Sequence, residues 1–208
     1  MSAEDSGRTE ARMPVADAVA LVHALRRDDD VVVSSMGNAR EWMALGPLHE
    51  RDLVLVPSAM GHATSIGFGL ALAQPTRRIV VLSGDGSLLM NLGTLVTISA
   101  EMPPNLIVIV YDNGVYEVTG AQPTAGSPSA RVNRDAVDFA AVARACGWKS
   151  VYHWSAIEDW RRGAKEALAA RGPTLVILDV EPVRDRPGPK SPGPGGQRAQ
   201  QFMAALRG

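Results

Sequence analysis

Two apolar runs, each followed at once by small and polar residues, constrain the fold of this chain more than any other feature. Residues 78–83 form the first run, which ends in Gly84-Asp85-Gly86-Ser87. Residues 105–111 form the second, and Asp112-Asn113-Gly114 follows it. Short apolar runs of this kind are typical of strands covered on both faces of a parallel sheet. Because the carboxyl ends of parallel strands meet at one edge, we expect Asp85 and Asn113 to lie close together there.

The residue types at this edge favour a cation and an anionic ligand. A carboxylate, an amide oxygen and a backbone carbonyl suit Mg²⁺, and the N–H groups at a helix start suit a phosphate group. A dinucleotide fingerprint needs a third glycine where Leu89 stands. The phosphate-binding loop of nucleotide hydrolases needs Gly-Lys followed by Ser or Thr, which this sequence lacks. The plainer alternative is that Asp85 only caps a helix while Asn113-Gly114 makes a turn.

Helical periodicity and short apolar runs alternate along the rest of the chain. We expect helices at 15–25, 38–45, 62–73, 88–100, 135–146 and 155–170, and strands at 31–35, 53–56, 78–83, 105–111, 149–152 and 174–180. This alternation predicts an α/β fold, with a doubly wound, mostly parallel sheet and helices on both faces. Gly67 and Gly69 would weaken the helix at 62–73 unless it packs closely on another backbone or a ligand.

The 208 residues fit one domain between two tails. We expect residues 1–13 to be a disordered leader and residues 14–182 to form the domain. Residues 183–208, rich in Pro and Gly, are predicted to be a C-terminal arm in which 200–206 can form a last helical turn or two. The loop at 120–134 exceeds the usual length of a connection, which predicts a lid or a partner contact.

Composition excludes several classes of function. A formal net charge of −1 gives no electrostatic reason to expect nucleic acid or an anionic membrane as a partner. The single cysteine, Cys146, rules out an internal disulfide and an iron–sulfur cluster held by four thiolates. No apolar run approaches the roughly 20 residues that span a bilayer, and the N-terminus lacks a signal-peptide core. We therefore expect a cytoplasmic protein.

The segment Pro57-Ser58-Ala59-Met60-Gly61-His62, ahead of the first Gly-Asp-Gly, makes the pattern specific. Together with residues 84–93 and 112–124 it resembles the diphosphate-binding, C-terminal domain of thiamine diphosphate-dependent 2-oxoacid decarboxylases and acetolactate synthases. The likeness is greatest to the β subunits of sulfopyruvate decarboxylases and the matching half of phosphonopyruvate decarboxylases. Such a resemblance implies thiamine diphosphate and Mg²⁺ as cofactors.

The resemblance implies a role for each matching residue. Asp85 and Asn113 would bind Mg²⁺ through their side chains and Val115 through its carbonyl. The remaining cofactor contacts would come from Gly37, Asn38, Ser58, Met60, Gly84, Gly86, Ser87 and Tyr116. Of these, Gly86 and Ser87 would hold the diphosphate, the carbonyl of Ser58 would accept from the 4′-amino group, and Met60 would wedge beneath the bent cofactor. Gly84 is expected to be small because the chain turns sharply there.

Two residues depart from the pattern of these relatives. His62 replaces a small or apolar residue and Glu117 replaces a glycine, so both are candidate catalytic residues that could face the substrate. For His62 the alternative is an ordinary residue at a helix start. For Glu117 it is a solvated or interface side chain, and for Met60 a place in the core.

The resemblance also implies that this chain holds half of an active site. In these enzymes the glutamate that activates the aminopyrimidine lies on a separate pyrimidine-binding domain, and this chain is too short for both. We therefore expect a β subunit of a two-component decarboxylase for a small 2-oxoacid, with a pyrimidine-domain α subunit as its partner, in a homodimer or heterotetramer. The alternatives are a carboligase subunit like that of acetolactate synthase and a non-catalytic subunit that binds the cofactor.

Overall fold

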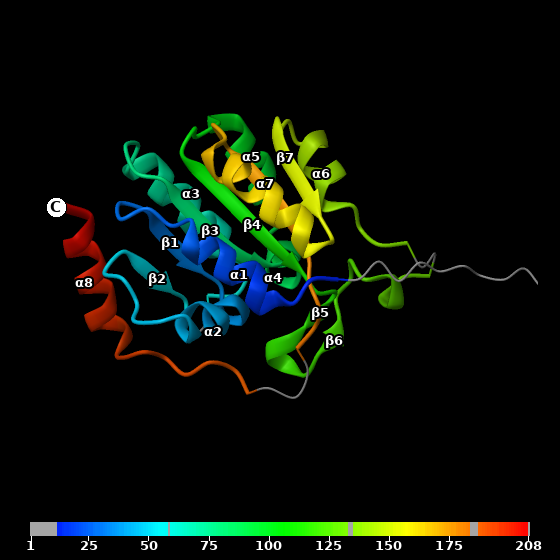
Figure 1. Ribbon diagram of the computed structural model, residues 1–208, viewed down its shortest axis with the longest axis horizontal. Coiled ribbons are helices and arrows are strands. Elements are labelled where there is room, and N and C mark those ends of the chain that lie inside the picture. Colours follow the sequence, from blue (N-terminus) through cyan, green and yellow to red (C-terminus); the bar gives the residue numbers. More distant parts are fainter. Residues whose placement is uncertain (1–11, 58, 133–134, 184–186, 208) are drawn as a thin grey trace, which may run out of the picture.

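A computed structural model describes residues 12–57, 59–132, 135–183 and 187–207. Six strands form one sheet in the order β2-β1-β3-β4-β8-β7, and every neighbouring pair is parallel (Figure 1). The strands are β1 Val31–Ser34, β2 Asp52–Val54, β3 Ile79–Gly84, β4 Leu106–Asp112, β7 Ser150–Trp154 and β8 Thr174–Asp179. The central strands β1, β3, β4 and β8 are buried along almost their whole length. The predicted α/β fold with a parallel sheet is confirmed.

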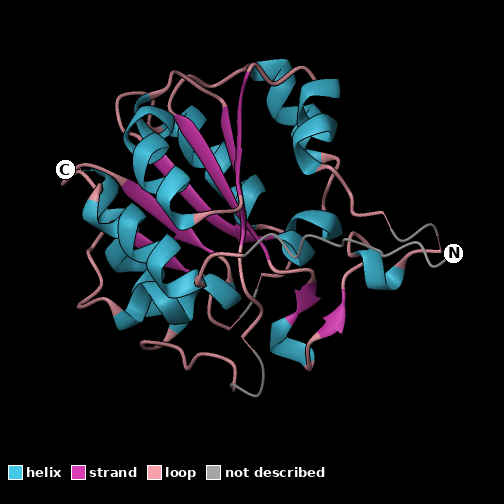
Figure 2. Ribbon diagram, turned by 45° about the vertical axis from the view of Figure 1, so that its right-hand side comes forward, coloured by secondary structure: helices cyan, strands magenta, loops and turns pink. Residues whose placement is uncertain are grey.

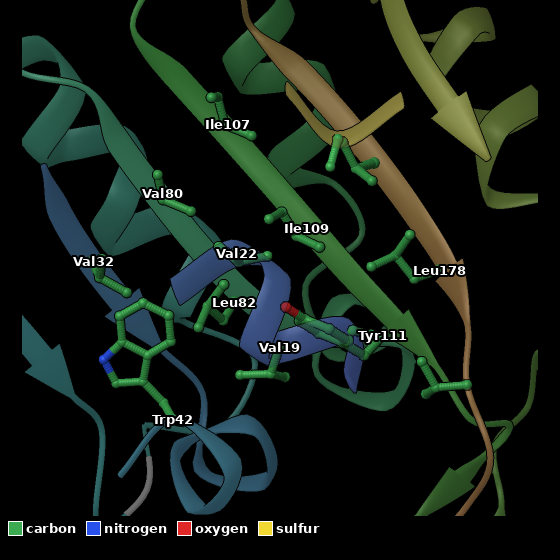
Figure 3. Close-up of a cluster of buried hydrophobic side chains, with 14 of the residues drawn as sticks. Val19, Val22, Val32, Trp42, Val80, Leu82, Ile107, Ile109, Tyr111 and Leu178 are labelled. Carbon is green, nitrogen blue, oxygen red and sulfur yellow. The ribbon is translucent and has the colours of Figure 1, made fainter. Parts of the chain in front are cut away.

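Helices cover both faces of this sheet, as a doubly wound fold requires. They are α1 Val15–Ala24, α2 Met36–Ala44, α3 Ala63–Ala73, α4 Asp85–Met90, α5 Thr94–Glu101, α6 Phe139–Ala145, α7 Ile157–Ala169 and α8 Gly195–Arg207. Alternate residues of each central strand enter different cores, because successive strand side chains point to opposite faces. Val80 and Leu82 pack under α1, α2 and α7 (Figure 3), whereas Ile79 and Val81 pack under α3, α5 and α6.

The predicted helix at 88–100 is two helices. The first, α4, begins at Asp85, so the Gly-Asp-Gly motif lies in its first turn. The chain then breaks before α5, where the Asn91 side chain donates a hydrogen bond to Ser65 Oγ at 2.8 Å. This bond joins the break to α3. The break is therefore stabilised by a tertiary contact, which the local sequence pattern does not reveal. A small hairpin, β5 Val115–Tyr116 with β6 Gln122–Pro123, was also not predicted and lies beside the main sheet (Figure 2).

Both tails hold more structure than the sequence predicted. The predicted leader reaches residue 13, but Met13 is buried and its N–H donates to the Asp179 carbonyl at 3.0 Å. Residues 1–11 of that leader lie outside the described ranges. The predicted C-terminal arm contains α8, longer than the turn or two expected at 200–206, and Phe202 is buried against the core. Among the helices described, none has both the length and the hydropathy needed to cross a bilayer.

Candidate functional site: a pocket at the carboxyl edge of the sheet

A pocket of about 280 Å³ opens at the carboxyl edge of the sheet. The register of β3 and β4 pairs Gly84 with Tyr111, so Asp85 and Asn113 follow closely after two paired positions, as predicted. The predicted cofactor residues that line the pocket are Gly37, Asn38, Met60, Gly84, Asp85, Gly86, Ser87, Asn113, Val115 and Tyr116. Ser58, the other residue of that set, lies outside the described residues. Predicted cofactor residues from distant segments of the sequence therefore line one pocket.

Asp85 presents a buried carboxylate to this pocket, with only 1% of the residue exposed. Its Oδ2 accepts a hydrogen bond from the Thr124 hydroxyl at 2.9 Å. Its Oδ1 is buried and accepts no hydrogen bond of normal geometry in the described part of the chain, although the backbone N–H groups of Gly86 and Asn113 lie close enough to the carboxylate to lower its pKa. Burial, with the nearby negative charge of Asp112, raises the pKa of Asp85 from 3.8 to about 7. A buried carboxylate oxygen left without a partner is costly unless a cation pairs with it, so these residues fit a bound metal ion.

Asn113 begins a tight loop directly after β4, next to Asp85. Its Oδ1 accepts a hydrogen bond from the Val115 N–H at 2.9 Å, and Gly114 follows with a φ of +72° that favours glycine. The Gly114 carbonyl in turn accepts from the Thr124 N–H at 2.9 Å. An amide oxygen has two lone pairs, so Asn113 keeps one for a further partner.

The two glycines of the Gly-Asp-Gly motif differ in how closely other atoms approach them. A Cβ placed on Gly86 would lie 2.6 Å from the Tyr116 ring, so only glycine lets that ring pack on the first turn of α4. At Gly84 a Cβ would meet only the Tyr111 carbonyl, at 4.0 Å. The expectation that Gly84 must be small is therefore not explained by contacts in the described part of this chain.

The two candidate catalytic residues have different positions. Glu117 lines the pocket, and its Oε1 accepts a hydrogen bond from the Val183 N–H at 2.7 Å. His62 is exposed, just before α3, and is absent from the pocket wall; its Nδ1 lies 2.7 Å from the Met60 carbonyl. Met60 is 45% exposed at the mouth, so the core alternative for it does not hold. The structure brings Glu117 to the pocket and leaves His62 outside it.

Sequence reasoning missed the role of Thr124, which is fully buried and bonds to both Asp85 and Gly114. It lies in the loop at 120–134, and its hydrogen bonds to Asp85 and Gly114 fix Thr124 behind the residues that line the pocket. The polar composition of that loop indicated a lid and hid this role. A lid role for the rest of the loop stays a prediction, and residues 133–134 lie outside the described ranges. Glu41 and Tyr111, both buried, also line the pocket.

A second group of charged residues lies beside the pocket at the ends of β4 and β8. Burial raises the pKa of Asp112, and the neighbouring Asp179 raises it further, whereas Arg12 opposes the shift. Arg12 also donates to the carbonyls of Asp112 and Val180, both at 3.4 Å. The N-terminal segment thus supplies a positive charge close to the proposed metal ligands.

Comparison with known proteins assigns this chain to a protein family. Residues 35–178 match the family described as thiamine pyrophosphate enzyme, C-terminal TPP binding domain. Because the match covers most of the chain, the chain belongs to this family, and its cofactor is thiamine pyrophosphate, which is thiamine diphosphate.

Two individual relatives show which kinds of enzyme in this family the chain is similar to. The chain is 42% identical over 85% of its length to a phosphonopyruvate decarboxylase of Streptomyces viridochromogenes, and covers 42% of that protein. It is 38% identical to the sulfopyruvate decarboxylase subunit beta of Methanothermobacter thermautotrophicus, over 74% of this chain and 76% of that subunit. It thus spans less than half the length of the phosphonopyruvate decarboxylases it matches.

A solved structure shows the same fold. A thiamine diphosphate-dependent 4-hydroxybenzoylformate decarboxylase from Rhodococcus jostii RHA1 matches with a TM-score of 0.67 and 24% identity. The match covers 87% of this chain and 35% of that one. The fold therefore extends across nearly all of this chain but forms only one part of the larger enzyme.

Proposed function

We propose that this chain is the β subunit of a two-component decarboxylase of a small 2-oxoacid, and that it binds thiamine diphosphate with Mg²⁺. The observation that carries this proposal is the buried, half-partnered carboxylate of Asp85 at the start of α4, in a chain of this family. The chain covers 76% of a relative that is named as a subunit beta, which supports the two-component arrangement.

In this proposal Asp85 and Asn113 bind Mg²⁺ with their side-chain oxygens and Val115 with its carbonyl, as hard oxygen ligands suited to the ion. Thr124 orients the Asp85 carboxylate through its hydrogen bond. The N–H groups of Gly86 and Ser87 hold the diphosphate, because the first N–H groups of a helix have no partner within the helix. Across the pocket, Gly37 and Asn38 at the start of α2 contact the same group.

Thiamine diphosphate, when bound, supplies a carbon nucleophile and an electron sink for the loss of CO₂ from a 2-oxoacid. Met60 supports the cofactor from the mouth, and the Tyr116 ring closes the wall over α4 and keeps water from that side. Activation of the aminopyrimidine needs a glutamate, which we assign to a pyrimidine-domain α subunit. In support, the Glu117 carboxylate is already bonded to the backbone of Val183. A cytoplasmic location stays a prediction.

The test is to purify this chain alone and with a co-expressed pyrimidine-domain subunit, and to measure CO₂ release from sulfopyruvate and phosphonopyruvate. We expect release only when both subunits, thiamine diphosphate and Mg²⁺ are present, and none with Asp85→Ala. Turnover by the isolated chain would overturn the two-component assignment. An acyloin product in place of an aldehyde would identify a carboligase, and cofactor binding without any turnover would identify a non-catalytic subunit.

A further inference from the structure

The C-terminal segment runs from the pocket to the far edge of the sheet. From residue 187 onward the chain passes below α2 and rises beside β2 into α8 (Figure 1). We call its described part, Val183 and residues 187–207, the C-terminal strap. Contacts at both ends of the strap hold it in this course.

At the pocket end, the strap bonds to two separate wall segments. The Val183 N–H donates to Glu117 Oε1 at 2.7 Å, and Arg40 of α2 donates to the Pro187 carbonyl at 3.0 Å. Glu117 belongs to a single 3₁₀ turn, Glu117–Thr119, which follows β5. The strap therefore joins α2 to this turn.

Apolar packing reinforces the same junction. A Cβ on Gly188 would lie 3.4 Å from Met36 Cε and 3.6 Å from Val118 Cγ1, which places the strap backbone directly against these side chains. Met36 and Val118 line the inside of the pocket. The strap is thus a second layer behind the pocket wall.

At the far end, the strap is anchored to the edge strand β2. The Arg198 guanidinium donates to the carbonyls of Val54 and Val56, the latter at 2.7 Å, and to Ser191 Oγ at 2.9 Å. Phe202 is buried in the core, and Arg77 donates to the Leu206 carbonyl at 2.7 Å. These contacts fix α8, so the strap can transmit a restraint from the sheet edge to the pocket.

We propose that Glu117 is a positioning residue: its carboxylate holds the strap, and the strap fixes the wall formed by α2 and the turn Glu117–Thr119 for the bound cofactor. A single 3₁₀ turn has poor hydrogen-bond geometry, so the contact with the strap adds a restraint to the one that the β5–β6 hairpin gives this turn. This inference rests on the proposed function, because it takes thiamine diphosphate as the ligand.

The test separates the effect of the Glu117–Val183 hydrogen bond from the effect of the negative charge of Glu117. Glu117→Gln keeps an oxygen that can accept from Val183, whereas Glu117→Ala keeps none. We expect trypsin to cleave cofactor-free Glu117→Ala after Lys190 several-fold faster than the wild type. We also expect calorimetry with Mg²⁺ to show thiamine diphosphate binding about 3- to 10-fold weaker in Glu117→Ala. Glu117→Gln should stay within about twofold of the wild type in both measurements.

A variant at the far anchor tests the strap itself. Arg198→Met lies outside the pocket wall and should weaken cofactor binding in the same direction, whereas Gln200→Ala, exposed on the same helix, should not. The proposal would be overturned if Glu117→Gln bound thiamine diphosphate as weakly as Glu117→Ala. It would also be overturned if Glu117→Ala kept the affinity of the wild type. If the wild type fails to bind thiamine diphosphate, the proposed function falls, yet faster cleavage of Glu117→Ala would still support the bond to the strap.

Discussion

At the scale of single residues, Asp85 is held in a state that destabilises the cofactor-free protein. Its pKa is raised to about 7 because the carboxylate is buried and Asp112 lies nearby. The folded protein therefore holds a proton on Asp85 at pH values where the unfolded chain has lost it. Since stability falls with rising pH wherever the folded state binds more protons, this group lowers the free energy of unfolding as the pH rises from about 4 to 7.

Replacing Asp85 with asparagine should separate stability from binding. Between pH 5.5 and 8 the wild type without cofactor should lose about 2 kcal/mol of unfolding free energy through this group, and Asp85→Asn should not. The amide oxygen can still accept from Thr124, so the fold is retained. Urea denaturation at the two pH values measures the difference, and calorimetry should show no Mg²⁺-dependent binding of thiamine diphosphate. Equal pH dependence in both proteins would contradict the buried, protonated state.

At the scale of secondary structure elements, α3 shows how a glycine can set the distance between a helix and the sheet. A Cβ on Gly67 would lie 2.1 Å from Val81 Cγ2 of β3, whereas one on Gly69 would meet nothing within 4 Å. The close packing expected of this helix is therefore confirmed at Gly67 alone. Gly69 faces outward and carries only the cost of a flexible residue in a helix.

The two glycines give a matched pair of variants in one helix. Gly67→Ala should destabilise the protein by about 1–3 kcal/mol, because the new methyl group forces α3 away from β3. Gly69→Ala should stabilise it by about 0.5–1 kcal/mol, because alanine favours the helix. Urea denaturation would measure both changes, and a stabilising Gly67→Ala would refute the tight contact.

At the scale of the whole molecule, the mouth of the pocket exposes apolar surface. Met60 and Met90 both line the pocket, and they are 45% and 51% exposed. Exposed apolar side chains gathered at a binding site commonly mark an interface. The predicted α subunit would cover the cofactor from this side and would account for their exposure.

We expect the chain to associate through this face. Light scattering should show at least a homodimer alone and a heterotetramer with the α subunit. Met60→Glu should weaken the association with the partner, because a charge would be buried without a partner. Leu72→Glu, on an exposed position of α3 outside the pocket wall, serves as the control. A chain that stays monomeric in both mixtures would contradict this arrangement.

Much of the fold and site could be predicted because the signals are local. The runs at 79–82 and 106–110 read as buried strands, and parallel strands place their following residues at one edge, which brought Asp85 and Asn113 together. The predictions fail where contacts between residues far apart in the sequence determine the local structure. The break between α4 and α5 depends on Asn91 meeting Ser65, and Met13 is ordered by its pairing with Val180. Neither contact leaves a periodic signal in the sequence.

The sequence by itself determined the type of fold and the chemical groups of the site, since both follow from residues adjacent to their strands. Only the tertiary structure decided how those groups are used. Thr124 bonds to Asp85 across 39 positions, and Glu117 bonds to Val183 across 66. His62, two residues after Met60 in the motif, lies outside the pocket wall. Such pairings depend on how separate elements pack together, because burial and hydrogen bonding at long range are properties of the assembled molecule.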